Sequence, residues 1–185
     1  MRLGNRYTCG MRTMIVFLLL SLTSLAVAGE SAAGMRWTAP AGWTKNEGAQ
    51  PMRVATYAVA PAPGDRNGAE CVIYFFGVGQ GGSVDANIER WKDQFRAPDG
   101  KPAVAQVAKR TIHGLTVTTI DASGTYSGMG GPLAAQPAVG GYRLLGAILE
   151  GPGGNLFVKL TGPAKTIATN QQKFDQLIAS FQPDK

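Results

Sequence analysis

An apolar run of six residues, Cys71-Val-Ile-Tyr-Phe-Phe76, places the strongest limit on how this 185-residue chain can fold. A strand turns alternate side chains to opposite faces, so a strand built from this run has two apolar faces that both need cover. Turn-forming residues precede it from Pro61 to Gly68 and break the chain there. The run therefore predicts a central strand between two layers, not one side of an open sheet.

The residues that follow this strand have the pattern of an amphipathic helix. Ser83 is placed to cap its start, Asp85 lies in the first turn, where the helix dipole favours a negative charge, and Pro98 begins the turn after it. The apolar positions recur at steps of four, three and four along Val84, Ile88, Trp91 and Phe95. We predict a helix that covers one face of the sheet.

The rest of the chain alternates between strand patterns and turns. Hairpin turns are expected at His113-Gly114 and at Gly151–Gly154, and an apolar stripe after Gly162-Pro163 predicts a closing helix. In the predicted strand at 52–59, Met52 and Val54 are expected to share a face. The further predicted strands are Met52–Val59, Ala103–Ile112, Leu115–Tyr126, Tyr142–Leu149 and Asn155–Thr161. This order predicts an α+β fold, with an antiparallel sheet of about six strands flanked by helices.

Several of these features resemble the PsbP-like superfamily, which is named for an extrinsic protein of photosystem II. They are the W-x-x-P-x-G-W segment from Trp37 to Trp43, the helix after the central strand, and a final strand leading into a helix that closes on Ser180-Phe181. The resemblance covers most of residues 35–182. It implies an α/β/α sandwich on an antiparallel sheet and a non-enzymatic binding or assembly module, and it transfers no catalytic residue.

The N-terminal residues have the layout of a secretory signal peptide. Three arginines precede an apolar run, Met14–Ala28, that ends in small residues suited to cleavage after Ala28. The run is short for a bilayer core about 30 Å thick. We predict a signal peptide at 1–28, a flexible tail at 29–34 and a single domain at 35–185, exported to the periplasm or secreted, with no stable membrane span after cleavage. An uncleaved N-terminal anchor is the alternative.

Charge and cysteine content limit the partners. The chain has 18 basic and 12 acidic residues, and the signal segment contains three of the basic residues and none of the acidic ones, which leaves a net charge of +3 after cleavage. No run of basic residues interleaved with aromatics is present, so we do not expect a nucleic-acid partner. Cys71 is the one cysteine left after cleavage, and it therefore has no partner for an internal disulfide.

A glycine-rich segment, Gly77–Gly82, matches the G-x-G-x-x-G pattern of dinucleotide sites. That pattern belongs to a strand–helix–strand unit with an acidic residue about 20 residues further on, at the end of a parallel strand. Here the corresponding window is the turn Pro98–Pro102, and the later segments are hairpins. We interpret the glycines as a structural turn and expect no cofactor. An anion at the Ser83 end is the binding alternative.

The sequence contains no pattern typical of a catalytic or metal site. His113 is the only histidine and lies in a turn, no G-x-S-x-G motif is present, and the acidic residues lack the spacing of a calcium loop. Cys71 is expected to be buried and inert. We therefore expect no catalytic residue, no metal and no enzymatic activity.

Two hypotheses for function follow. The first is an exported binding or assembly module that contacts a protein or envelope component through the Ser127–Gly141 loop or a sheet edge. The alternative is a small-ligand carrier or enzyme with a pocket between sheet and helix. The candidate contacts for a ligand or partner are Arg143, Lys159, Tyr126 and Ser83, and Glu150 is a further polar candidate. Convergence of Arg143, Lys159 and Tyr126 in one cleft would favour the pocket.

Overall fold

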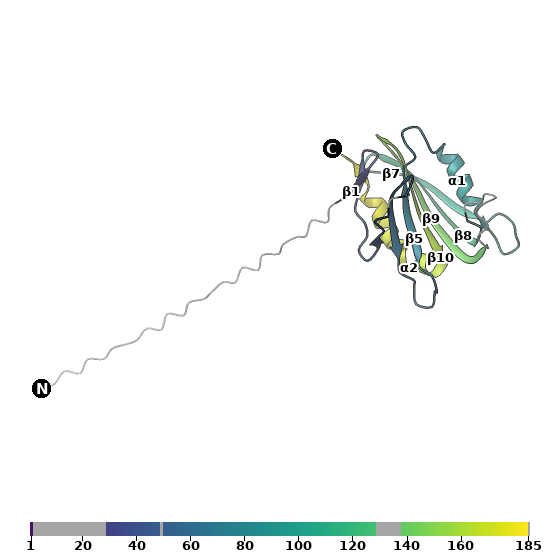
Figure 1. Cartoon of the computed structure of the whole chain (residues 1–185), viewed down its shortest axis with the longest axis horizontal. Coiled ribbons are helices and arrows are strands. Elements are labelled where there is room, and N and C mark those ends of the chain that lie inside the picture. Colours follow the sequence, from purple (N-terminus) through teal and green to yellow (C-terminus); the bar gives the residue numbers. More distant parts are fainter. Residues whose placement is uncertain (2–28, 49, 129–137, 185) are drawn as a thin grey trace.

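The computed structural model describes residues 1, 29–48, 50–128 and 138–184. Within these residues, two antiparallel sheets and two helices form a layered α+β fold (Figure 1). Apart from Met1, the expected signal peptide lies outside the described residues, as does the segment 129–137 of the expected Ser127–Gly141 loop.

The main sheet has eight strands in the order β3-β4-β5-β10-β9-β8-β6, and β7 pairs with β8 along the same edge as β6. Every neighbouring pair is antiparallel. The strands are β3 (Thr44–Lys45), β4 (Arg53–Val59), β5 (Ala69–Tyr74), β6 (Phe95–Arg96), β7 (Ala105–Ile112), β8 (Leu115–Tyr126), β9 (Val139–Gly151) and β10 (Gly154–Pro163). The expected antiparallel α+β class is confirmed, and the two additional strands, β3 and β6, have two residues each.

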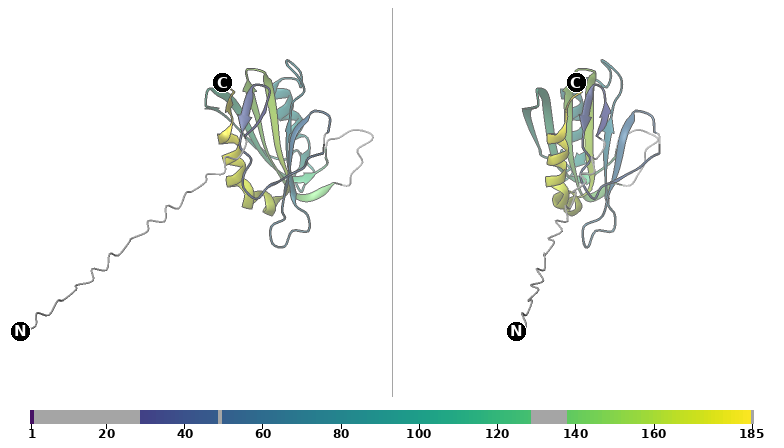
Figure 2. Two further views of the ribbon diagram at one scale, coloured as in Figure 1. Left: turned by 60° about the vertical axis from the view of Figure 1, so that its left-hand side comes forward. Right: turned by 90° about the vertical axis from the view of Figure 1, so that its left-hand side faces the viewer.

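Two helices cover opposite faces of this sheet (Figure 2). They are α1 (Val84–Lys92) and α2 (Ala164–Ser180). The Ser83 side chain accepts a hydrogen bond from the backbone of Ala86 at 3.2 Å, so the predicted cap of α1 is confirmed. Phe95, which was expected on the helical stripe, instead begins β6, because α1 ends at Lys92 and the chain turns back to pair with β8.

The two faces of β10 contribute to separate hydrophobic cores. Leu156, Val158 and Leu160 pack on the α2 side, whereas Phe157 packs on the α1 side. The side chains of the central strand β5 also pack into both cores. Cys71 is buried on the α2 side, and Tyr74 packs on the α1 side. Two-sided burial of the central strands is thus confirmed.

A second sheet joins the beginning and the end of the described fold. It has three strands, β1 (Glu30–Ala32), β2 (Met35–Trp37) and β11 (Gln182–Pro183). The Phe181 ring stacks on Trp37 with centroids 5.2 Å apart. The expectation of a flexible tail at 29–34 is therefore wrong, because β1 pairs with β2 and Glu30 accepts a hydrogen bond from Tyr57 and pairs with Lys45.

Strand β4 corrects a prediction about side-chain direction. A register shift between Arg53 and Ala55 breaks the alternation, so the residues buried on the α2 side are Ala55, Tyr57 and Val59. Met52 precedes the strand with a φ of 64° and is 60% exposed. Met52 therefore does not belong to the core.

The two predicted hairpin turns are present. His113 and Gly114 connect β7 to β8 with φ values of 47° and 82°, as a two-residue turn with both central residues left-handed requires. The chain also reverses between β9 and β10 after Gly151. Neither helix in the described part of the chain is long and apolar enough to cross a membrane.

Gly146 provides a test of how closely α1 packs on the sheet. A Cβ atom at this position would lie 2.6 Å from Cζ3 of Trp91 and 2.8 Å from Cγ2 of Ile120. We expect Gly146→Ala to lower the free energy of unfolding by about 1–3 kcal/mol in urea denaturation, because the added methyl overpacks the core. Gly48→Ala is the control, since nothing lies within 4 Å of its Cβ. Equal stability of the two variants would contradict this packing.

Candidate ligand pocket

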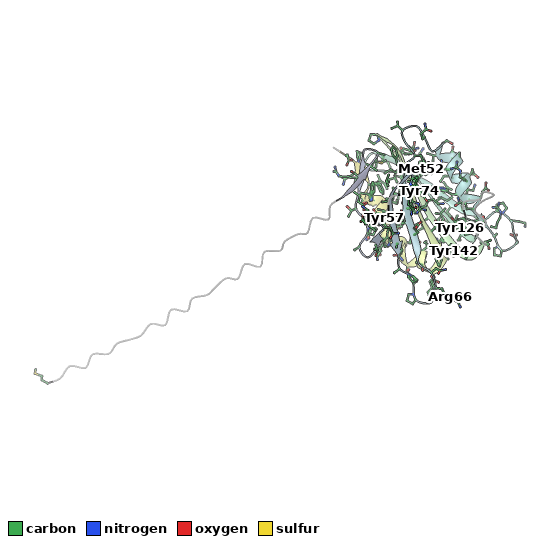
Figure 3. The ribbon with its side chains drawn as sticks, in the orientation of Figure 1. Met52, Tyr57, Arg66, Tyr74, Tyr126 and Tyr142 are labelled. Atoms are coloured by element: carbon green, nitrogen blue, oxygen red, sulfur yellow. The ribbon has the colours of Figure 1, made fainter. Side chains whose placement is uncertain are left out.

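A cavity of about 270 Å³ lies between α1 and the main sheet. Its lining comes from four parts of the chain: the segment 51–53 at the start of β4, the segment 74–76 at the end of β5, α1, and β10. Tyr74 and Met52, both labelled in Figure 3, belong to this lining. The location is the one expected for a pocket between sheet and helix.

The glycine segment before α1 packs against two aromatic rings of the pocket lining. Gly81 has a φ of 92°, and a Cβ there would lie 2.9–3.0 Å from the rings of Phe76 and Phe157. The Asn87 amide donates to the carbonyl oxygens of Gly81 and Ser83 at 2.7 and 2.9 Å. These contacts fasten the segment to the first turn of α1. Strand β5 before it is antiparallel to both neighbours, which is not the context of a dinucleotide fingerprint.

Lys159 is the most deeply buried charged group of the cavity, with 7% of the residue exposed. Its ammonium donates to Oε1 of Gln94 at 3.0 Å and lies 5.6 Å from the centre of the Trp91 ring. All 12 acidic residues of the chain lie in the described part, and none forms an ion pair with Lys159. Burial, with a smaller contribution from Arg90, lowers the pKa of Lys159 from 10.5 to about 8.

Two arginines also line the cavity. The Arg53 guanidinium lies 5.6 Å from the centre of the Tyr74 ring and donates to Glu70 at 3.0 Å. Arg90 donates to Oδ1 of Asn87 at 3.0 Å. Together with Lys159 they place three cationic side chains around the cavity, whose described lining contains no carboxylate. The cavity therefore favours a ligand with negative charge.

Aromatic rings form much of the remaining lining. Tyr74 and Phe76 stack with ring centroids 5.9 Å apart. Phe76 and Phe157 meet edge to face, with ring centroids 5.2 Å apart. Burial raises the pKa of Tyr74, so this phenol is neutral at ordinary pH. The rings present apolar faces and edges suited to a flat ligand.

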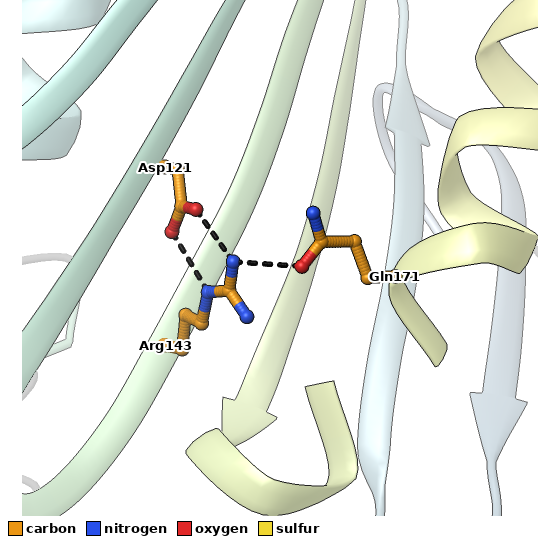
Figure 4. Close-up of polar contacts among 3 residues, drawn as sticks. All are labelled: Asp121, Arg143 and Gln171. Atoms are coloured by element: carbon orange, nitrogen blue, oxygen red, sulfur yellow. Dashed lines mark hydrogen bonds and ion pairs between the residues drawn. The ribbon is translucent and has the colours of Figure 1, made fainter. Parts of the chain in front are cut away.

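Arg143 lies on the opposite face of the sheet. Its guanidinium donates to both carboxylate oxygens of Asp121 and, at 2.9 Å, to Oε1 of Gln171 (Figure 4). The hydrogen bond to Asp121 raises the pKa of Arg143 above its ordinary value. Arg143, Lys159 and Tyr126 therefore do not converge in one cleft, the arrangement named above as favouring the pocket, because Arg143 and Lys159 point to opposite faces of the sheet. Arg143 connects β9 to β8 and α2.

The other predicted contact residues lie outside the cavity lining. Tyr126 is on the α1 side of the sheet, between Phe95 and Tyr142, with ring centroids 5.1 and 5.9 Å away. Ser83 uses its hydroxyl oxygen to cap α1. Glu150 lines a separate hollow of about 400 Å³ together with Lys109. Of the four candidate contacts, Lys159 alone belongs to the pocket.

Sequence reasoning missed Arg53 and Arg90. The helical pattern indicated that Arg90 points away from the apolar stripe, and no sequence signal places Arg53 beside Tyr74. Cys71 is fully buried, and burial raises the pKa of its thiol, so it offers no reactive thiolate. Within the described residues, no three His, Cys, Asp or Glu side chains gather as metal ligands would.

Comparison with solved structures finds remote similarity. A Pseudomonas aeruginosa protein of unknown function, PA94, is 16% identical, with a TM-score of 0.46, over 68% of this chain and 78% of that one. The cyanobacterial PsbP of Synechocystis sp. PCC 6803, CyanoP, is 14% identical, with a TM-score of 0.45, over 82% of this chain and 87% of that one. Both similarities concern the arrangement of helices and strands and extend to neither family nor role. No family model and no curated protein sequence matches the chain.

The lowered pKa of Lys159 predicts how stability changes with pH. Between about pH 8 and 10.5 the unfolded chain keeps a proton on this lysine that the folded protein has lost, so folding becomes more favourable as pH rises. Relative to Lys159→Met, we expect the free energy of unfolding of the wild type to increase by about 1–3 kcal/mol between pH 7 and pH 10, measured in urea.

The raised pKa values of Cys71 and the buried tyrosines make folding less favourable as pH rises. This effect is the same in the wild type and in Lys159→Met, so it cancels when the free energies of unfolding of the two are compared. Lys109→Met, at an exposed position of β7, is the control and should follow the wild type. A constant difference between wild type and Lys159→Met over this pH range would contradict the burial of the charge.

Proposed function

We propose that this chain is an exported, non-enzymatic binding module that holds a small anionic ligand with a flat apolar body. The ligand occupies the cavity between α1 and the main sheet. The observation that carries this proposal is the position of Lys159, Arg53 and Arg90 around an aromatic cavity without a lining carboxylate. Of the three cations Arg53 alone is ion-paired within the described residues, with Glu70, so a negative group on the ligand would supply a counter-charge for Lys159 and Arg90, and the ligand's apolar body would cover the aromatic rings.

The size of the cavity supports a compact ligand. Its volume of about 270 Å³ is slightly below the roughly 300 Å³ at which the range for small-molecule sites begins. A bicyclic aromatic acid is of suitable size, whereas a dinucleotide is too large.

The lining favours binding over turnover. A proton-transfer step needs a donor and an acceptor with suitable pKa values within reach of the same ligand. The described lining offers no histidine, carboxylate or thiol. Its arginines stay protonated at any ordinary pH, so Lys159, with a pKa of about 8, is the lining group that exchanges a proton near neutral pH, and within the described lining no second group of matching pKa accompanies it.

Export is the cellular part of the proposal. The first described strand, β1, begins at Glu30, so cleavage after Ala28 would keep every described strand and helix. The Glu30 side chain contributes to the fold through Tyr57 and Lys45. A processed chain that begins at Gly29 would retain these contacts.

Binding of 2-naphthoate tests the pocket. We expect titration calorimetry to detect binding to the wild type, and Arg90→Gln to weaken it about tenfold, because a charge-assisted hydrogen bond is lost. Arg110→Gln is a charge-matched control, since Arg110 lies on β7 away from this cavity. The neutral analogue 2-naphthamide should bind more weakly than the acid. An equal loss of affinity in Arg90→Gln and Arg110→Gln, or equal affinity for the acid and the amide, would count against the proposal.

Processing of the full chain in a bacterial host tests export. We expect N-terminal sequencing of the protein recovered outside the cytoplasm to begin at Gly29. Ala28→Glu should block this cleavage, because the residue before the cut must be small. Ala33→Glu, beyond the cleavage site, should leave processing unchanged. Retention of the unprocessed wild-type chain in the cytoplasm would contradict export.

A further inference from the structure

Lys159 differs chemically from the two arginines that share its cavity. An arginine keeps its proton in any protein environment, whereas a buried lysine can lose its proton and become a nucleophilic amine. Three cations would not be needed to hold a single anionic group. Arg53 lies on β4, Arg90 on α1 and Lys159 on β10.

We propose that Lys159 captures the ligand covalently and reversibly, as an imine with an aldehyde or ketone group. This inference rests on the proposed function: the arginines hold the anionic end of the ligand, and a carbonyl group at its other end meets Lys159. The ligand class is therefore an aromatic or conjugated carbonyl compound that also carries an acidic group.

The chemistry balances without any added reagent. The lone pair of Nζ attacks the carbonyl carbon and forms the C–N bond. The two hydrogens of the neutral amine leave with the carbonyl oxygen as one molecule of water, and a C=N bond remains. Nothing is oxidised or reduced, so neither an electron donor nor an acceptor is required.

The surroundings hold the Lys159 amine in place. Nζ donates to Oε1 of Gln94 at 3.0 Å, and the main-chain carbonyl of Gln94 in turn accepts hydrogen bonds from the amide and hydroxyl of Ser127 at 3.0 and 3.2 Å. The Trp91 ring covers the ammonium on one side, 5.6 Å away, and limits access of water. Exclusion of water favours an imine over its hydrolysis.

The protonation state of Lys159 suits a nucleophile. With a pKa of about 8, about a tenth of the side chain is neutral at pH 7, compared with well under one in a thousand for an exposed lysine. The charged and titratable groups that share this side of the cavity are Arg90 on α1, Arg53 on β4, and Glu70 and Tyr74 on β5. Arg90 acts with burial to favour the neutral amine.

Reductive trapping tests the capture. The purified protein is incubated at pH 7 with 6-formyl-2-naphthoate and sodium cyanoborohydride, and modified lysines are located by peptide mass mapping. We expect Lys159 to be labelled at least about tenfold faster than the exposed Lys101 and Lys109, in line with its larger neutral fraction and the local concentration of bound probe. Labelling of Lys159 no faster than these surface lysines would overturn the inference.

Two controls separate this inference from the proposed function. The isosteric 6-methyl-2-naphthoate cannot form an imine, so its binding in calorimetry reports the pocket alone. Lys159→Arg removes the nucleophilic amine, and we expect it to lose the rapid label at position 159 while the exposed Lys101 keeps its slow one. Binding of the methyl compound without capture of the aldehyde at Lys159 overturns the imine and leaves the pocket intact. Failure of both compounds to bind overturns the pocket and the imine together.

Discussion

Strand β10 has to bury both of its faces, and the layers of the molecule are arranged around this requirement. On one side, α2 has 17 residues and packs with the small sheet over a continuous apolar core. On the other side, α1 has nine residues, about 14 Å of helix, whereas the ten residues of β10 extend over about 33 Å. The short helix cannot cover the strands along their length. The cavity with Lys159 lies on this incompletely covered side.

The elements with a strong periodic pattern could be predicted from the sequence. The strands, the hairpin at His113-Gly114 and the Ser83 cap follow from local residue types, which act within a few positions along the chain. The small sheet could not be predicted in this way, because β1 and β11 have three and two residues. Their order depends on long-range contacts, such as the hydrogen bond from Tyr57 to Glu30 and the stacking of Trp37 on Phe181.

The candidate site shows the same limit at single residues. Lys159 and Arg143 give similar sequence signals, each a cation within a largely apolar strand. The register of the sheet gives them different roles: Arg143 can reach Asp121 on the neighbouring strand, whereas Lys159 lies opposite Val72 and Gly146, which offer no carboxylate. Register is a property of the assembled sheet, so the sequence made both residues candidate contacts without separating the structural ion pair from the unpaired buried charge.

An apolar side chain at position 159 would suit a two-sided strand better than a lysine, because a buried cation without a carboxylate partner is unfavourable. The cost falls when the amine loses its proton, and it also falls when an anion enters the cavity. These two routes act in opposite directions on the pKa of Lys159. A ligand whose negative group meets Arg53 and Arg90 avoids this conflict. The arginines then hold the negative charge, and Lys159 can remain neutral. The cavity therefore supports a ligand with two different ends, one acidic and one carbonyl.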